Sequence, residues 1–190
     1  MLYKFAKAIF TPLGYLIYRI RVSGREHIPK DGKVIICSNH IHGMDCILLA
    51  IFCKRQVFYM GKKELFERPI LGPLLRRIGA FPVDRGATDM KAYRHALNIL
   101  KEDKQLGIFS QGTRAEDFEN VKSGVAVFAL KSGAPILPVG IKGNYRPFTK
   151  MRVQFGEPIP MTQYEGQKVK SELVDEIMEE VVCRVSALSS

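Results

Sequence analysis

Short apolar runs alternate along the chain with longer segments in which apolar side chains recur at helical spacing. The short runs are rich in β-branched and aromatic residues and end in polar turns, a pattern typical of buried strands. Strands that are buried on both faces need helices on both sides of their sheet. The pattern therefore predicts an α/β fold, with strands at 33–38, 56–60, 80–84, 106–110, 135–141 and 151–156.

The amphipathic segments between these runs predict helices at 44–52, 70–78, 88–101, 122–131 and 168–186. In the third of them Met90, Tyr93 and Leu97 fall on one face, and Thr88 is the expected N-cap. The connections are short, and the sequence shows no internal repeat or long linker. We expect a single layered domain over residues 21–190, with a mostly parallel or mixed sheet flanked by helices.

Residues 1–20 form a distinct segment, in which Leu2 and Phe5 begin an apolar stripe at helical spacing that basic side chains avoid. The uncharged run is well short of the roughly 20 residues that a membrane-spanning helix needs. No small-residue cleavage site follows, so a secretory signal is not expected. We expect an amphipathic helix, bent or broken near Pro12 and Gly14, that lies in a membrane interface; packing against its own domain is the alternative.

The net charge of +10 is concentrated in the first half of the chain. Residues 1–85 hold 15 basic and 6 acidic side chains, whereas residues 86–190 hold 14 and 13. Such a field favours an anionic partner, whether nucleic acid, a phosphorylated metabolite or an acidic lipid surface; an excess of solvated lysines is the alternative. The basic residues are not interleaved with aromatic ones, so we expect no nucleic-acid partner.

Chemically capable residues follow four of the predicted strands. SNHIHGMD (38–45) follows the first, GKK (61–63) the second, DRG (84–86) the third and SQGTR (110–114) the fourth. In α/β sheets the chemistry gathers where the strands end and the loops begin. These four segments are therefore the candidate functional site.

His40 and Asp45 are the candidate proton-transfer pair. Five residues apart on one helix, their side chains would point about 140° apart and could not cooperate. They meet if His40 ends a strand, Gly43 allows a sharp turn and Asp45 begins the next helix, near the positive end of its dipole. An ionised Asp45 bonded to one imidazole nitrogen would fix the tautomer and make the other nitrogen a better base. An N-capping turn with a satisfied histidine is the structural alternative.

A metal site at His40, His42 and Asp45 is a further interpretation, but it needs more ligands. The other histidines, His27 and His95, have no ligand-rich neighbours, so we expect no metal. The chain lacks a GxSxG elbow, a GxxxxGK[ST] loop and a GxGxxG motif, which leaves covalent and nucleotide-driven chemistry without support. The four cysteines form no CxxC pair and are expected to be small buried residues in a reducing compartment.

The other three strand ends offer donors for an anion. Lys62 and Lys63 follow the second strand, Arg85 follows the third, and Arg114 follows the fourth. An arginine in such a place can grip a phosphate through two hydrogen bonds. Each of these residues alone is commonly a solvated charge or one member of a local pair. Together, near a His–Asp base, they predict a pocket for a phosphorylated alcohol.

The chain contains four sequence blocks in this order: NHxxxxD at 39–45, VDRG at 83–86, QGTR at 111–114 and PILPVGI at 135–141. This order resembles the glycerolipid acyltransferases, in particular the 1-acylglycerol-3-phosphate acyltransferases. The similarity runs from about residue 21 to 156, with GKKELF between the first two blocks. One block would be weak evidence, whereas four in the order of the family are specific.

The resemblance implies a role for individual residues. His40 would act as general base on a glycerol hydroxyl, and Asp45 would orient it. The hydroxyl would attack the thioester of acyl-CoA or acyl-carrier protein directly, with no cofactor and no acyl-enzyme, while backbone N–H groups hold the oxyanion. The positions that bind the acceptor or line its channel would be Lys62, Arg85, Gly112, Thr113, Arg114 and Pro138.

The reaction implied by the resemblance is acyl transfer to the free sn-2 hydroxyl of lysophosphatidic acid, a step of phospholipid biosynthesis. The enzyme would sit on the cytoplasmic face of the cell membrane, with its N-terminal helix as anchor on the anionic surface. Glycerol-3-phosphate, another lysophospholipid and a lyso-aminolipid are the alternative acceptors.

The sequence departs from the pattern of the family at two positions. The third block usually reads PEGTR, and Gln111 keeps the size and hydrogen bonding of that glutamate without its charge. The first block commonly has Ser or Thr where this chain has His42. Gln111 invites the rival interpretation of a lipid-surface binding protein without catalysis. A metal-dependent hydrolase that uses His40, His42 and Asp45 is the third interpretation.

Overall fold

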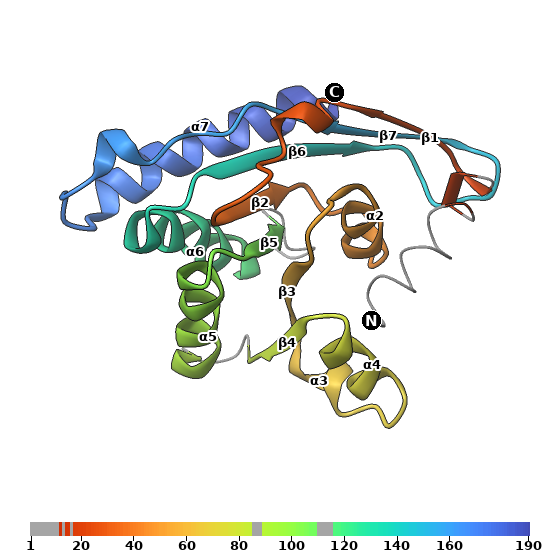
Figure 1. Cartoon of the computed structure of the whole chain (residues 1–190), viewed down its shortest axis with the longest axis horizontal. Coiled ribbons are helices and arrows are strands. Elements are labelled where there is room, and N and C mark those ends of the chain that lie inside the picture. Colours follow the sequence, from red (N-terminus) through yellow and green to blue (C-terminus); the bar gives the residue numbers. More distant parts are fainter. Residues whose placement is uncertain (1–11, 13, 16, 85–88, 110–115) are drawn as a thin grey trace.

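The computed structural model describes residues 12, 14, 15, 17–84, 89–109 and 116–190, with the backbone alone for 116–123. Within this part of the chain, seven strands form one sheet in the order β1-β7-β6-β2-β5-β3-β4 (Figure 1). Neighbouring strands are parallel except for β6 and β7, which are antiparallel. The strands are β1 (Arg19–Ser23), β2 (Val34–Ser38), β3 (Val57–Lys62), β4 (Ala80–Val83), β5 (Gln105–Phe109), β6 (Ile136–Lys142) and β7 (Lys150–Phe155).

Helices pack on both faces of this sheet. Helix α2 (Asp45–Phe52) covers one face, and α5 (Met90–Lys101), α6 (Glu116–Ser132) and α7 (Ser171–Ser189) cover the other. Two short helices, α3 (Lys63–Phe66) and α4 (Leu71–Arg77), connect β3 to β4 at the edge of the sheet (Figure 1). Short 3-10 turns occur at Arg25–His27 and Thr162–Tyr164. None of the helices in the described ranges has the length and apolar content needed to cross a membrane.

Strand β2 divides the core into two layers because successive residues of a strand point to opposite faces. Ile35 and Cys37 join the cluster beneath α5, α6 and α7, whereas Val34 and Ile36 join the cluster that contains α2. All five residues of β2 are buried, which accounts for its continuous apolar pattern. The polar segment after β2 therefore begins at the carboxyl edge of the sheet, in its middle.

The structure confirms the predicted α/β class, a mixed sheet flanked by helices, and contains the predicted strands and the five helices predicted between residues 44 and 186, with shifted ends. Strand β1 and helix α3 are missed. β1 is an edge strand in which exposed Arg19 and Arg21 flank buried Ile20, so it lacks the continuous apolar pattern of the central strands. The helix predicted for residues 1–20 lies largely outside the described residues, and its predicted end is wrong because Arg19 and Ile20 belong to β1.

The predicted N-cap of α5 is wrong. Asp89, and not Thr88, holds this position, and its carboxylate accepts hydrogen bonds from the backbone N–H groups of Lys91 and Ala92, both at 3.0 Å. Its other oxygen accepts from the N–H of Asp84 at 3.1 Å. Asp89 therefore ties the end of β4 to the start of α5, a contact that the helical spacing alone does not reveal. Thr88 lies outside the described residues.

Gly107 of β5 leaves room for the ring of Tyr59, because a Cβ at this position would lie 2.1 Å from Tyr59 Cε1. We predict that Gly107→Ala lowers the free energy of unfolding by about 1–3 kcal/mol, since the ring must leave its place. Urea unfolding measures this change. Gly124→Ala in α6 is the matched control, because its Cβ would meet Phe128 Cε2 at 3.9 Å and alanine favours a helix. An equal loss of stability in both variants would contradict the steric explanation.

Candidate active site

The segment from Ser38 to Asp45 joins the end of β2 to the start of α2, as the sequence predicts. β2 ends at Ser38, and Asp45 is the first residue of α2 with Met44 at the N-cap. Between them lies His40, which is half-buried, whereas Asp45 is completely buried. The Nδ1 atom of His40 and the Oδ2 atom of Asp45 are 2.7 Å apart. The predicted strand–turn–helix junction and its His–Asp pair are therefore formed.

Four hydrogen-bond donors surround the carboxylate of Asp45. Oδ2 accepts from Nδ1 of His40 at 2.7 Å, and from the backbone N–H groups of Ile41 and His42 at 2.7 and 2.8 Å. Oδ1 accepts from the hydroxyl of Tyr145 at 2.6 Å. Because backbone N–H groups can only donate, this arrangement favours an ionised carboxylate to which His40 donates its Nδ1 proton. Nε2 of His40 is then the unprotonated nitrogen, which can accept a proton from a substrate.

The charge of Asp45 is stabilised in spite of its burial. Burial alone would raise the pKa of Asp45, because a charged group is disfavoured away from water. The hydrogen bonds from its four donors outweigh this effect and hold the pKa of Asp45 below its ordinary value. Its place at the N-terminus of α2 also favours a negative charge. Asp45 is therefore an anion at neutral pH and can stabilise a positive charge on His40.

The turn between His40 and Asp45 is held by the carboxylate and not by a glycine conformation. The prediction that Gly43 supplies the turn is wrong, because Gly43 has no positive φ and a Cβ there would meet nothing within 4 Å. Instead, the N–H groups of Ile41 and His42 converge on Asp45 Oδ2, and the Asp45 N–H donates to the His42 carbonyl at 2.9 Å. The group that orients His40 therefore also shapes the loop that carries it.

His42 contacts the turn and Tyr145. Its side chain is exposed, and its Nδ1 accepts a hydrogen bond from the backbone N–H of Met44 at 3.3 Å. Its ring lies against that of Tyr145, with the centroids 4.7 Å apart. The hydrogen bond from His42 to Asp45 comes from the backbone, so a different side chain at position 42 would leave that bond in place.

Tyr145 is the site residue that the sequence analysis misses. It lies in the loop between β6 and β7, 100 positions after Asp45. Burial, the hydrogen bond to Asp45 and the charge of Asp45 all raise the pKa of Tyr145, so its hydroxyl stays protonated as a donor. Tyr18 packs edge-on against the Tyr145 ring at a centroid distance of 5.7 Å, and its hydroxyl donates to the Tyr145 carbonyl at 3.4 Å. The one sequence signal for this residue is a tyrosine shortly after the fourth block.

Two further residues fix the place of His40. The side chain of Asn39 is buried, donates to the carbonyl of Ile141 and accepts from the N–H of the same residue, both at 2.8 Å. This pair of bonds ties β2 to β6 just beyond the end of β2. On the other side, the ring of His40 stacks on Phe109, the last residue of β5, with the centroids 4.4 Å apart. His40 is therefore held between the two strands that flank β2.

Among the predicted acceptor-binding residues, Lys62 lies in the described part of the chain, at the carboxyl edge of the sheet where β2 also ends. It is the exposed last residue of β3, and β5 separates β3 from β2. At a strand spacing of about 4.8 Å, the ends of β2 and β3 are roughly 10 Å apart. Lys63 pairs instead with Asp84, at an N–O distance of 3.7 Å. Outside the described residues lie Arg85, which follows shortly after β4, and Gly112, Thr113 and Arg114, which follow β5 in the sequence.

Pro138 is not brought to His40. It lies in β6 between Leu137 and Val139, which belong to the core layer on the side of α2. Because side chains alternate along a strand, Pro138 faces the side of α7. A Cβ built on Gly156 would lie 3.0 Å from Pro138 Cγ and 2.9 Å from Leu188 Cδ1 of α7. Pro138 therefore packs against the far side of the sheet from α2, and the fourth block contributes to the site through Ile141 and the loop after it.

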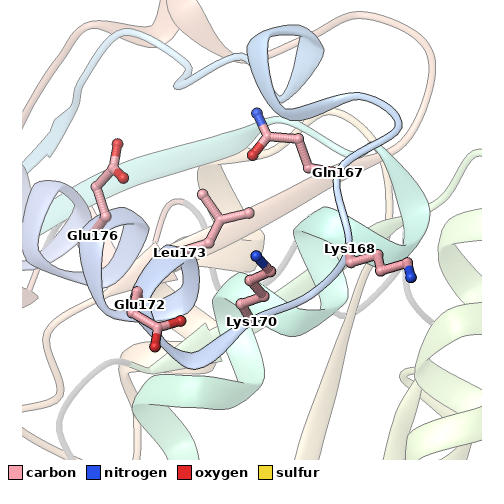
Figure 2. A pocket seen from close by; sticks show the side chains of 6 residues that line it. All are labelled: Gln167, Lys168, Lys170, Glu172, Leu173 and Glu176. Atoms are coloured by element: carbon pink, nitrogen blue, oxygen red, sulfur yellow. The ribbon is translucent and has the colours of Figure 1, made fainter.

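No group of three or more His, Cys, Asp or Glu side chains able to hold a metal ion occurs among the described residues. A pocket opens near the start of α7, and the residues that line it all come from the stretch 167–176 (Figure 2). Its lining contains two lysines and two glutamates and none of the predicted site residues, so it offers no net charge for an anion. The lining residues are Gln167, Lys168, Lys170, Glu172, Leu173 and Glu176.

Comparison with known proteins identifies the family. The model of the family described as Acyltransferase matches residues 19–142, which run from β1 to the end of β6. The chain belongs to the acyltransferase family. It is 30% identical to a Bacillus subtilis protein named 1-acyl-sn-glycerol-3-phosphate acyltransferase, over 90% of this chain and 89% of the relative. A Borreliella burgdorferi protein of the same name is 28% identical, with 86% of this chain and 72% of the relative covered.

A solved structure supports the same assignment. The crystal structure of the 1-acyl-sn-glycerophosphate (LPA) acyltransferase from Thermotoga maritima matches this acyltransferase with a TM-score of 0.71 and 28% identity. The match covers 98% of this chain and 76% of that one. The layered sheet and the family resemblance expected from the four sequence blocks are thus confirmed, and the chain is an acyltransferase.

Tyr145→Phe tests the role of the fourth donor to Asp45. The variant keeps the ring that packs on His42 and removes the hydroxyl, so we predict a higher pKa for Asp45, measured by carbon NMR titration of its carboxyl group. A hydrogen bond to a charged group is worth about 1.5–3 kcal/mol, and we expect kcat to fall by about tenfold or more. Tyr18→Phe, which loses a bond to the Tyr145 carbonyl, is the control and should change both values less. An unchanged Asp45 pKa in Tyr145→Phe would contradict this role.

The lowered pKa of Asp45 also predicts how stability depends on pH. The ionised group stabilises the folded state fully above its unfolded pKa, near 3.8. This contribution is lost as the pH falls through the lower pKa of the folded state. We predict that Asp45→Asn shows a smaller loss of unfolding free energy than the wild type when urea unfolding is compared between about pH 6 and pH 3. Identical pH dependence in the two proteins would contradict the stabilised carboxylate.

Proposed function

We propose that this acyltransferase moves a fatty acyl group from acyl-CoA or acyl-carrier protein to the free sn-2 hydroxyl of 1-acylglycerol-3-phosphate, giving phosphatidic acid. The observation that carries the proposal is the 2.7 Å bond between His40 Nδ1 and the ionised Asp45, which leaves Nε2 as a base. The names of the relatives from Bacillus subtilis, Borreliella burgdorferi and Thermotoga maritima support the choice of acceptor.

The chemistry follows from the state of His40. Nε2 takes the proton from the acceptor hydroxyl while the hydroxyl oxygen attacks the carbonyl carbon of the thioester. The resulting imidazolium is stabilised by the charge of Asp45. The C–S bond then breaks, the thiolate takes the proton back from Nε2, and the new ester and the free thiol leave. The reaction consumes neither metal nor cofactor.

Direct attack by the substrate is supported by the state of the side chains near His40. Burial raises the pKa of the Cys46 thiol, which makes it a poor nucleophile at neutral pH. The hydroxyl of Ser38 is buried and donates to the Asn39 carbonyl at 3.0 Å. These two groups of the described part of the chain are unsuited to attack, which supports the acceptor hydroxyl as the nucleophile that His40 activates.

The phosphate of the acceptor is assigned to the basic residues that follow the neighbouring strands. Lys62, exposed at the end of β3, supports this assignment. The remaining acceptor-binding positions in the proposal are Arg85, Gly112, Thr113 and Arg114. The reaction would take place at the cytoplasmic face of the cell membrane, where an anionic surface attracts the basic first half of the chain. Glycerol-3-phosphate and other lysolipids are the alternative acceptors.

An assay matrix tests the proposal. Thioesters of CoA and of acyl-carrier protein are each combined with lysophosphatidic acid, glycerol-3-phosphate, lysophosphatidylcholine or no acceptor, and release of free thiol is measured. We expect rapid release with lysophosphatidic acid and little without an acceptor. Release that needs no acceptor would indicate a hydrolase, and chelator-sensitive release a metal-dependent one. Vesicle binding with no release under any condition would indicate a lipid-binding protein without catalysis.

His40→Ala and Asp45→Asn test the mechanism. Removing a general base typically lowers kcat by about 10²–10⁴-fold, and we expect this range for His40→Ala and a large loss for Asp45→Asn as well. His42→Ala is the matched control, because it removes a neighbouring imidazole and keeps the backbone bond to Asp45. His40→Ala with full activity, or His42→Ala with the greater loss, would overturn the assignment of the base.

A further inference from the structure

The α3–α4 hairpin presents apolar side chains to solvent. Ile70, the N-cap of α4, is 84% exposed, and Leu74, one turn later, is 45% exposed. They lie on one face of the helix because residues four apart are neighbours on its surface. Pro69 and Pro73 beside them are exposed as well. Together these four residues, called the apolar ridge below, form an exposed apolar surface.

The ridge is separate from the face by which α4 packs on its own domain. Leu71, Leu75 and Ile78 recur at helical spacing and are half-buried, so they already supply the inward stripe that a surface helix needs. A second apolar stripe on the outer side contributes nothing to this packing. Adjacent exposed apolar side chains that serve no internal packing are consistent with contact to a partner or a membrane.

The hairpin holds the ridge rigidly. Gly72 of α4 packs so closely on α3 that a Cβ there would lie 2.2 Å from the carbonyl oxygen of Phe66. The guanidinium of Arg76 lies over the ring of Phe66, 5.1 Å from its centroid. Ile70 and Leu74 are thus fixed in an exposed position by the packing of α3 against α4.

Basic side chains surround the ridge. Residues 62–79 contain five basic and two acidic side chains. Arg68 precedes the ridge, and Arg77 lies one turn beyond Leu74 on the same side of α4; both are exposed. Apolar side chains flanked by exposed arginines match the boundary of an anionic bilayer, where the apolar groups enter the acyl region and the cations stay among the headgroups.

We propose that the α3–α4 hairpin docks into the surface of an anionic phospholipid bilayer, with Ile70 and Leu74 inserted and Arg68 and Arg77 on the headgroups. This contact lies within the described part of the chain and is distinct from the predicted helix at residues 1–20. The hairpin begins directly after Lys62, the last residue of β3. It therefore starts at the carboxyl edge of the sheet, where β2 also ends and leads to His40. Docking there brings the catalytic edge of the sheet close to the bilayer.

Binding of the full chain to vesicles tests this proposal without any need for catalysis, so its failure leaves the proposed function untouched. Partition is measured by sedimentation with vesicles of phosphatidylglycerol mixed with phosphatidylcholine, and with vesicles of phosphatidylcholine alone. We expect Ile70→Ser/Leu74→Ser to weaken partition to the anionic vesicles by roughly tenfold or more. We expect Arg68→Gln/Arg77→Gln to reduce both the preference for anionic vesicles and the salt dependence of binding.

Matched controls come from α5. Met90 is 47% exposed, close to the value of Leu74, so Met90→Ser removes a similar exposed apolar side chain. Arg94→Gln/Lys101→Gln removes two exposed positive charges from the same helix. Both controls should bind vesicles like the wild type. Because all the substituted side chains are exposed, unchanged circular dichroism and melting temperature will show that the variants are folded.

Wild-type partition of Ile70→Ser/Leu74→Ser to anionic vesicles would overturn the proposal. If this variant then also binds acyl-carrier protein more weakly, the hairpin is a protein-docking site. If it instead loses a dimer in analytical ultracentrifugation, the ridge is an interface between two copies of this chain.

Discussion

The buried carboxylate of Asp45 is the constraint on which the rest of the site depends. An anion without access to water is strongly disfavoured unless its charge is paired and its lone pairs are satisfied. Asp45 meets this requirement with four donors, which come from the turn after β2 and from the loop after β6. The same bonds that stabilise the charge set the direction of the His40 ring and the course of the turn. Stability and chemistry therefore impose the same geometry.

The order of the strands supplies what this carboxylate needs. β6 and β5 flank β2, so the loop after β6 reaches Asp45 from one side while Phe109 at the end of β5 supports His40 from the other. Asn39 secures the first of these neighbours through its two bonds to Ile141. A sheet with another strand order would place neither Tyr145 nor Phe109 beside the pair. The long connections between β2, β5 and β6 thus serve to assemble a site from distant segments.

This dependence on topology explains which parts of the site can be predicted from the sequence. The junction from His40 to Asp45 is local, so spacing and strand and helix signals suffice to find it. Tyr145 acts across 100 positions, and its contact exists only because β6 lies next to β2. Gly43 is the opposite case, because a local turn signal predicts for it a role that the Asp45 carboxylate fulfils. The sequence does not predict β1, because an edge strand with exposed arginines lacks the continuous apolar run of the buried central strands.

Tyr145 also connects the site to Ile17 and Tyr18, which lie just before β1 at the end of the segment predicted as the N-terminal helix. The hydroxyl of Tyr18 donates to the Tyr145 carbonyl, and the loop after Tyr145 bonds to the same segment through Phe148 N–H to the Ile17 carbonyl, at 2.7 Å. β1 then runs parallel to β7, which follows this loop. Tyr145 therefore links the chain that enters the domain at Tyr18, from the proposed membrane surface, to the Asp45 carboxylate. With the lipid acceptor proposed above, attachment of the N-terminal segment to a membrane would stabilise the loop that orients His40, the proposed base.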